Sequence, residues 1–457
     1  METIKLEKER RMEIRFRSDF YADVRTEDRF RTTISYRAGE LEEYRVRCEV
    51  RSFLRVYDGR MWYYASVTDP LRIQETLDGL YATATPNAEI LADPIVRRFE
   101  VNRASEDRFA DCSVREVPTE EKHALLSGLL PLLEEDACMT MPFGLYLDRN
   151  SRFSFRSSLG AEVSYTYQTC GVMLGCSMVE GERKHSAYCS RGDVRFDGLR
   201  DYGAVLREEL REHADFMRNS VAVEAGVYPV VLSPVAAGVF AHESFGHKSE
   251  SDFMLSDETM REEWQLGMTV GSPILSIVES GELLGSGYVP FDDEGTRARK
   301  NYLIKNGVLA GRLHSAATAA ALDEDVTGNA RAVDGTYEPI VRMTNTYIEG
   351  GDLSFDELLA PIKKGYFIKD ISHGSGMSTF TLAPTLAYEI CDGRLGRPVQ
   401  ISVITGNVFR TLGLIDGLTR DEKQLSFVAG GCGKMEQSGL PVGFGGPYVR
   451  VSEMNVQ

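Results

Sequence analysis

The stretch "FAHESFGHKSESDF", residues 240–253, contains two histidines and an adjacent carboxylate, which are residue types that bind and use a metal ion. His242 and Glu243 begin like the zinc-peptidase pattern HExxH, in which both histidines chelate from one face of a helix. Here the second histidine, His247, comes one residue late. The stretch is therefore either a pairing of structural histidines or a metal site of a different geometry.

The five-residue spacing restricts that geometry. Positions i and i+4 of an α-helix lie about 40° apart around its axis, whereas positions i and i+5 lie about 140° apart. A straight helix would therefore point the two imidazoles away from each other. Chelation requires a π-turn between them, or a helix that ends at Gly246 in a left-handed cap and swings His247 round. Both alternatives fit the sequence.

Two local signals place this stretch on a helix that follows a strand. The apolar run "VYPVVLSP" is typical of a buried strand, and Ser233 followed by Pro234 is a favourable helix start. The next residues, "VAAGVFAHESFGH", then form a helix that carries His242 and Glu243. Beyond this helix the chain consists of many short, glycine-rich segments, which predict a mostly β domain.

The sequence before residue 220 has a different pattern. Residues 30–67 alternate between apolar and polar side chains, with turn-like "RAGE" and "YDGR", and predict an antiparallel meander with one solvated face. Arginine and glutamate on that face are expected to pair across strands. Helical spacing follows at 69–84, 119–137 and 202–226. We expect an α+β fold, with an N-terminal α+β domain at 1–220 and a C-terminal domain at 221–457.

Composition excludes several classes of protein. The formal net charge of −17 argues against direct nucleic-acid binding, which needs a basic surface. The charged start has no apolar segment of the signal-peptide kind, and no stretch approaches the roughly 20 apolar residues of a membrane span. We therefore expect a soluble cytoplasmic protein whose eight cysteines are reduced, mostly buried thiols.

Other polar residues allow more than one interpretation. The "DDEG" at 292–295 either binds a cation or forms a β-turn with Gly295 in a left-handed conformation, and the turn is the preferred interpretation. Glu250 and Asp252 either accept hydrogen bonds from the metal-binding histidines or are solvated. His213 and His314 lack ligand-type neighbours in the sequence, and His373 is a candidate substrate contact.

The C-terminal half resembles the TldD/PmbA family, metallopeptidases once called modulators of DNA gyrase. The resemblance extends from about residue 227 to the end and includes a helix with HExxxH after a "PVVLSP"-like strand. The intact HExxxH is similar to the catalytic TldD-type branch, since PmbA-type partner subunits lack it. Residues 369–380 differ from the family pattern. Further stretches agree in order: "FDDEGTRARKNYLIKNGVLAGRL" (291–313), "TGNARA" (327–332), "VRMTNTYIEGGD" (341–352) and "GGCGKMEQSGLPVGFGGPYVRV" (430–451).

The resemblance implies a third ligand and a mechanism. Its cysteine in a "GSCGK"-like loop matches Cys432 in "GGCGK", which would join His242 and His247 on one zinc ion per chain. Two neutral imidazoles and a thiolate leave a centre of net charge +1 with a free fourth position, as in catalytic zinc sites. Glu243 would then be the general base.

The resemblance also implies substrates and partners. The expected substrates are unfolded or flexible peptides bound as extended strands. The expected assembly is a dimer, with a PmbA-type partner subunit or with a second copy. The alternative function is a non-catalytic binding or regulatory protein on the same scaffold.

Overall fold

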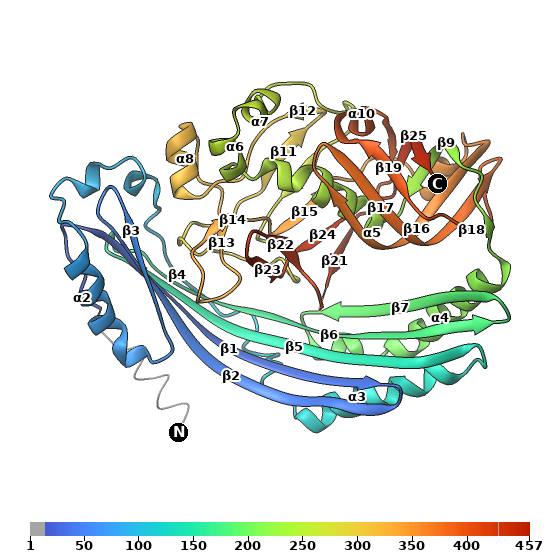
Figure 1. Ribbon diagram of the computed structural model, residues 1–457, viewed down its shortest axis with the longest axis horizontal. Coiled ribbons are helices and arrows are strands. Elements are labelled where there is room, and N and C mark those ends of the chain that lie inside the picture. Colours follow the sequence, from blue (N-terminus) through green and yellow to red (C-terminus); the bar gives the residue numbers. More distant parts are fainter. Residues whose placement is uncertain (1–13, 428) are drawn as a thin grey trace.

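The computed structural model describes residues 14–427 and 429–457 (Figure 1). The N-terminal part is one large sheet with helices, and the C-terminal part is rich in short strands, so the predicted α+β fold class is confirmed. Residues 1–13, which contain most of the charged start that argues against a signal peptide, lie outside the described part.

The N-terminal sheet has seven strands in the order β3-β2-β1-β5-β6-β4, with β7 paired to β6. It is antiparallel except where β4 runs parallel to β6. Figure 1 shows that the long strands curve beneath the C-terminal part. The strands are β1 (Tyr21–Arg37), β2 (Glu40–Tyr57), β3 (Trp62–Val67), β4 (Arg103–Glu106), β5 (Met139–Ser157), β6 (Glu162–Glu180) and β7 (Arg183–Asp193).

The two faces of this sheet have different neighbours because successive side chains point to opposite sides. Val24 and Ile34 of β1 belong to apolar clusters with the helices α2 (Ile73–Thr83), α3 (Thr119–Leu129) and α4 (Tyr202–Asn219). The other face of β1 is turned toward the C-terminal part, where Arg25 pairs with Asp293 at 3.0 Å. Figure 1 shows α3 and α4 along the outer side of the sheet.

The helix predicted at 202–226 is shorter than expected. It begins at Tyr202 but ends at Asn219. The next residues form β8 (Val221–Ala222), which pairs with β18 (Arg394–Gln400) in the C-terminal part. Pairing with a distant strand therefore ends the helix earlier than its amphipathic pattern indicates.

The C-terminal part contains a small barrel and a second sheet. Pairing in the order β16-β9-β25-β19-β17 closes into a ring because β17 also pairs with β16. The barrel strands are β9 (Gly226–Leu232), β16 (Lys364–Gly376), β17 (Thr379–Cys391), β19 (Ile404–Asn407) and β25 (Val449–Val456). The second sheet has the order β12-β11-β10-β15-β24-β21, with bounds Val308–Leu309, Asn301–Lys305, Ile277–Glu279, Asn345–Ile348, Gly443–Gly446 and Lys423–Ser426.

The "DDEG" segment is a turn that connects the C-terminal part to the N-terminal sheet through an ion pair. Asp292 accepts the backbone N–H groups of Glu294 and Thr296, and Gly295 has a φ of +77°, as the preferred interpretation predicted. Glu294 reaches the buried Arg55 of β2 at 3.0 Å. Since a buried carboxylate and guanidinium must pair to offset their desolvation, the segment has a structural role in this fold.

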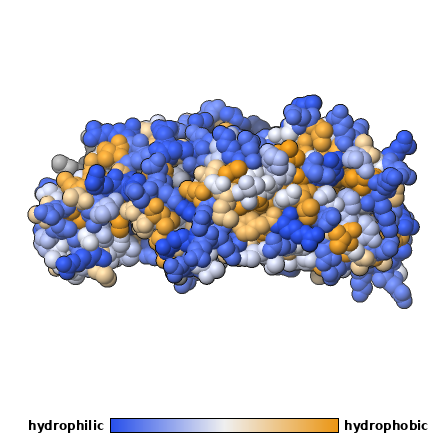
Figure 2. Space-filling model, turned by 90° about the horizontal axis from the view of Figure 1, so that it is seen from above, coloured by the Kyte–Doolittle hydropathy of each residue, from blue (hydrophilic) through white to orange (hydrophobic). Residues whose placement is uncertain are grey.

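The outer surface is largely polar. Seen from above the view of Figure 1, hydrophilic residues predominate and apolar residues lie in separate groups (Figure 2). Among residues 14–427 and 429–457, no helix is long and apolar enough to cross a membrane.

His213 forms a buried contact that the sequence did not indicate. It lies on α4, is 3% exposed, and its Nδ1 is 2.8 Å from Nε2 of His185 on β7. Burial lowers the pKa of His213 to about 3, and the neighbouring His185 adds to this effect. The imidazole is therefore neutral in the folded protein at moderately acidic pH.

This pair predicts a pH dependence of stability. In the unfolded chain His213 takes up a proton below about pH 6.5, whereas the folded protein does so only near pH 3. The unfolded state then binds more protons between these values, so the free energy of unfolding should fall as the pH is lowered. The contribution is at most about 1.4 kcal/mol per pH unit. Urea unfolding across this range should show a shallower slope for His213→Gln, whereas the exposed-site control His373→Gln should keep the wild-type slope. Equal slopes would contradict the prediction.

Candidate metal centre

The helix that carries the first histidine begins where the sequence predicts. Ser233 caps α5 (Pro234–Ala241) by accepting the N–H of Ala236, and Pro234 occupies the first turn. The helix is almost wholly buried, and the position of Gly238 lies against the backbone of Gly445 in β24. This packing fixes the direction in which the following residues leave the helix.

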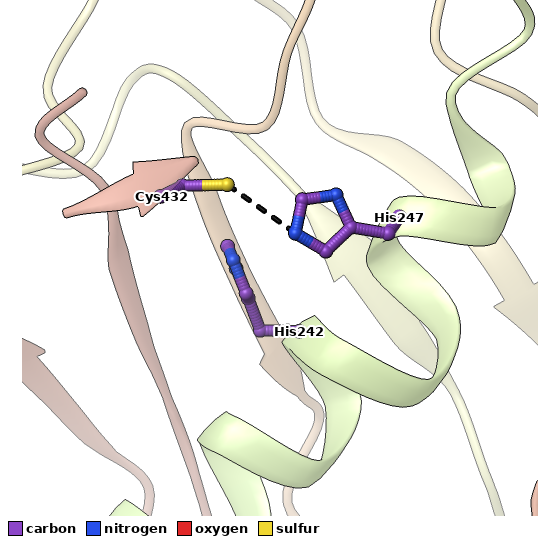
Figure 3. A group of neighbouring side chains, drawn as sticks. All are labelled: His242, His247 and Cys432. Atoms are coloured by element: carbon purple, nitrogen blue, oxygen red, sulfur yellow. Dashed lines mark hydrogen bonds between the residues drawn. The ribbon is translucent and has the colours of Figure 1, made fainter. Parts of the chain in front are cut away.

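A π-helix, His242–Gly246, follows α5 directly and explains the five-residue spacing. The N–H of His247 donates to the carbonyl of His242, which is the i+5 hydrogen bond of a π-turn. The wider turn brings the two imidazole centroids to 5.1 Å (Figure 3). The prediction of a π-turn is confirmed. The alternative, a left-handed cap at Gly246, is wrong because Gly246 has a φ of −56° and continues the helical conformation.

Gly246 is needed for space. A Cβ atom at this position would lie 2.1 Å from Sδ of Met343, a buried core residue. The sequence correctly singled out this glycine, but its role is close packing and not a left-handed turn.

We expect Gly246→Ala to destabilise the protein by about 1–3 kcal/mol, the usual cost of overpacking a core. The displaced π-turn should also weaken metal binding. Gly79→Ala in α2 is a matched control, because a Cβ there meets nothing within 4 Å. Urea unfolding measures the effect, and Gly246→Ala combined with Met343→Ala should recover part of the loss. A double variant no more stable than Gly246→Ala alone would show that this contact is not the cause.

Cys432 reaches the histidines from a separate hairpin. It begins β22 (Cys432–Lys434), which pairs with β23 (Gln437–Leu440). The preceding Gly431 has a φ of +149° and lies against the carbonyl of Leu440, so a side chain there would clash. The Cys432 Sγ is 3.3 Å from Nε2 of His247, and the ligand atoms of His242, His247 and Cys432 all lie within 4.8 Å of one another (Figure 3).

The electrostatics of the three residues favour a thiolate. Burial opposes ionisation of Cys432, but hydrogen bonds from His242 and His247 outweigh it and lower the pKa of the thiol to about 5. Burial also opposes the charge on His247, whereas its bonds to Cys432 and Glu250 raise the pKa of this imidazole to about 10. The thiolate is the form of cysteine that binds a metal.

A second set of charged residues supports His247. The fully buried Glu250 accepts from Nδ1 of His247 at 3.1 Å, so Nε2 is left to face Cys432. Lys434, two residues after Cys432, lies 3.2 Å from Glu250 and 2.6 Å from Asp252. Glu250 therefore accepts a hydrogen bond from a candidate ligand histidine, which is one of the two alternatives that the sequence left open. Asp252 does not contact a histidine and pairs with Lys434 instead. Lys434 was missed, although it stands in the same "GGCGK".

Glu243 lies beside the three candidate ligands with its carboxylate unengaged. Among the described residues, none forms a hydrogen bond or an ion pair with this half-buried side chain. Its Cγ is 3.4 Å from the Cβ position of Gly374, so it lies against β16. A carboxylate without a partner is available to exchange protons.

The donor set fits a metal ion. Nδ1 of His242 is buried and has no hydrogen-bond partner among the described residues, so this nitrogen is not occupied by a protein group. Two imidazole nitrogens and one thiolate match the preferences of zinc and leave one position of a tetrahedral centre free. The three residues converge from segments 185 positions apart in the chain.

The remaining candidate residues lie elsewhere. His314 is buried between Thr318 and Glu324, with Nε2 3.0 Å from the glutamate. His373 is exposed on β16 and contacts the hydroxyl of Ser372. In the described part of the chain, the cluster of side chains whose ligand atoms are close enough to share a metal ion is His242, His247 and Cys432.

The three residues form a candidate metal centre, and comparison with known proteins gives the class of protein that carries it. Residues 225–457 match the PmbA/TldA metallopeptidase C-terminal domain. A metalloprotease of Synechocystis is 30% identical over 95% of this chain and 94% of its own length. A zinc metalloprotease TldD homolog of Saccharolobus solfataricus is 32% identical over 51% of this chain and 52% of its own. The crystal structure of TldE from Thermococcus kodakarensis superposes with a TM-score of 0.76 at 15% identity, covering 95% of this chain and 96% of that chain.

The chain belongs to the PmbA/TldD family of metallopeptidases. It is accordingly a metallopeptidase, and the alternative of a non-catalytic protein on this scaffold is set aside.

Proposed function

We propose that this metallopeptidase hydrolyses peptide bonds in unfolded or flexible peptides, with one zinc ion per chain on His242, His247 and Cys432 and with Glu243 as general base. The observation that carries the proposal is the convergence of three ligand atoms within 4.8 Å beside an unpaired carboxylate. The name of the Saccharolobus relative, a zinc metalloprotease, supports the choice of metal.

Zinc at this position would supply Lewis-acid polarisation of the peptide carbonyl and lower the pKa of a water molecule. The protein must then move protons. Glu243 accepts the proton of the attacking water as the new C–O bond forms, and it delivers that proton to the amine nitrogen as the C–N bond breaks. Glu250 holds His247 in the tautomer whose Nε2 faces the centre.

An open strand edge supports the proposed substrate class. β16 pairs with β9 only over Tyr366–Ile368, and within the described residues the rest of β16 has a ladder partner on its β17 side alone. This free edge passes Glu243 at Gly374 and Gly376. An extended peptide that adds to it would bind through its backbone, with little dependence on its side chains. A folded substrate cannot present such a strand.

We further propose the expected cytoplasmic dimer, formed with a PmbA-type partner subunit or with a second copy, and a division of the chain into domains at 1–220 and 221–457.

Metal analysis and a peptidase assay test the proposal together. Protein purified without a histidine tag should contain about one zinc per chain and should cleave a flexible peptide but not the same sequence held in a folded domain. Chelation should abolish cleavage, and added zinc should restore it. The assay is run with and without a co-expressed partner subunit. A protein that binds no metal even after zinc is added would refute the proposed centre.

A further inference from the structure

The face of the N-terminal sheet that is turned toward the C-terminal part is rich in arginine. Arg31 of β1 lies directly opposite Arg47 of β2 and, on its other side, directly opposite Arg149 of β5. Residues directly opposite in a sheet share a face. We call these three residues the arginine row. Next to it, arginines pair with the few carboxylates of this face, as Arg29 does with Glu27 at 2.6 Å.

Within the arginine row Arg149 pairs with Glu27 at 2.6 Å, whereas Arg31 and Arg47 face each other without a carboxylate partner among the described residues. Like charges directly opposite in a sheet are destabilising. Arg31 and Arg47 are exposed and, among the described residues, neither forms an ion pair. Partial desolvation and the guanidinium groups of Arg149 and Arg29 lower the pKa of Arg31. In a chain of net charge −17, such a concentration of positive charge indicates an anionic ligand.

One end of the row, Arg149, lines a pocket that the hairpin of Cys432 also borders. A small pocket lies between the sheet and the C-terminal part, and Arg149 forms one wall of it. Its other walls include Arg331, the carboxylates of Glu27, Asp293 and Asp334, and Leu440, which is the ladder partner of Cys432. Arg149 of the arginine row and Leu440 of the hairpin that carries Cys432 therefore line the same pocket.

Two polar groups in this pocket lack the partners they need. Arg331 is 5% exposed and donates only to the backbone carbonyls of Met343 and Pro441. Among the described residues no carboxylate forms an ion pair with it; the nearby Asp293 favours its charge but pairs with Arg25 at 3.0 Å. The hydroxyl of Tyr165, a residue 7% exposed, has no hydrogen-bond partner among the described residues. The guanidinium of Arg331 and the hydroxyl of Tyr165 are both able to donate hydrogen bonds to an acidic side chain or to a terminal carboxylate.

We propose that the arginine row and the pocket at Arg331 form a docking track for acidic peptide segments, so that the peptidase prefers substrates rich in aspartate and glutamate. The inference rests on the proposed function, since it names the class of peptide that reaches that centre. Electrostatic complementarity of this kind raises the association rate and selects among partners. A nucleic acid is disfavoured because its phosphate backbone needs a basic surface more extended than this short row, in a chain of net charge −17.

The test uses three flexible peptides of equal length that differ only at positions outside the cleavage site, where they carry glutamate, glutamine or lysine. We expect kcat/KM at low ionic strength to be about tenfold higher for the glutamate peptide than for the glutamine peptide. The preference should shrink as salt is added. The double variant Arg31→Gln with Arg47→Gln should lose the preference for the glutamate peptide and leave turnover of the glutamine peptide unchanged. Arg211→Gln, an exposed arginine of α4, is the matched control.

Binding provides a readout that does not depend on hydrolysis. Fluorescence anisotropy of the labelled glutamate peptide with metal-free protein should show tighter binding than the glutamine peptide, and both the double variant and Arg331→Gln should lose this difference. If the glutamate peptide binds through the arginines but nothing is cleaved, the track stands and the proposed function fails. Equal binding of the two peptides would overturn the track, even with peptidase activity present. A single-stranded oligonucleotide that binds more tightly than the glutamate peptide would overturn it too, in favour of a nucleic-acid site.

Discussion

Glu243→Gln is expected to lose peptidase activity while the protein keeps its metal. Glutamine is nearly isosteric with glutamate but cannot accept the proton of the attacking water. General-base catalysis typically contributes about 10²- to 10⁴-fold to a rate, so kcat should fall by that amount. KM for a flexible peptide should change little, because Glu243 makes no contact among the described residues that a glutamine would break.

The measurement needs both turnover and metal content. Zinc per chain, determined by elemental analysis, should equal that of the wild type, which distinguishes a lost base from a lost ligand. Glu262→Gln, an exposed carboxylate of α7 (Glu258–Glu263), is the matched control and should keep full activity. Near-normal turnover of Glu243→Gln would overturn the assigned mechanism.

Cys432→Ser is expected to lose the metal and, with it, activity. The hydroxyl of serine stays protonated at neutral pH and replaces the only anionic ligand of the set. Loss of a supporting hydrogen bond around a metal typically costs about 10- to 100-fold in affinity. Loss of a ligand itself should therefore weaken zinc binding by more than about 100-fold. Competition with a chromogenic chelator measures this.

Cys391→Ser is the matched control, because Cys391 is a free thiol exposed at the end of β17. It should bind zinc as the wild type does. High zinc concentrations should restore part of the activity of Cys432→Ser if the hairpin still folds, and the unfolding curve reports on that. Unchanged zinc affinity would exclude Cys432 as a ligand.

The residues near His242 show how much local sequence determined. A five-residue spacing cannot chelate from a regular helix, so the sequence predicted a departure between His242 and His247. It also predicted the start at Ser233, because a cap and a proline act through hydrogen bonds and sterics of neighbouring residues. The form of the departure was left open. It is a π-turn because the helix stays packed in the core, where Met343 leaves room only for glycine at position 246.

The alternation over residues 30–67 likewise predicted an antiparallel meander, since a period of two reflects the geometry of a single strand, and β1, β2 and β3 pair in this way. It did not determine the end of α4, which depends on pairing between Val221 and Val399 of the distant β18. The sequence pattern also did not show that the imidazoles of His185 and His213 are in contact. These contacts join segments that no local rule connects.

The sequence by itself thus determined the start of the helix that carries the site and the reactive pair His242 and Glu243. Physical reasoning from the residues alone would have left Cys432 as a buried thiol, and only resemblance to a family indicated it as a ligand. Tertiary structure brings its sulfur within 3.3 Å of His247 across 185 residues of chain. In the same way, only the register of three strands places Arg31 beside Arg47 and Arg149. Short-range sterics and hydrogen bonds decide local structure, whereas strand register and core packing decide which distant side chains share a site.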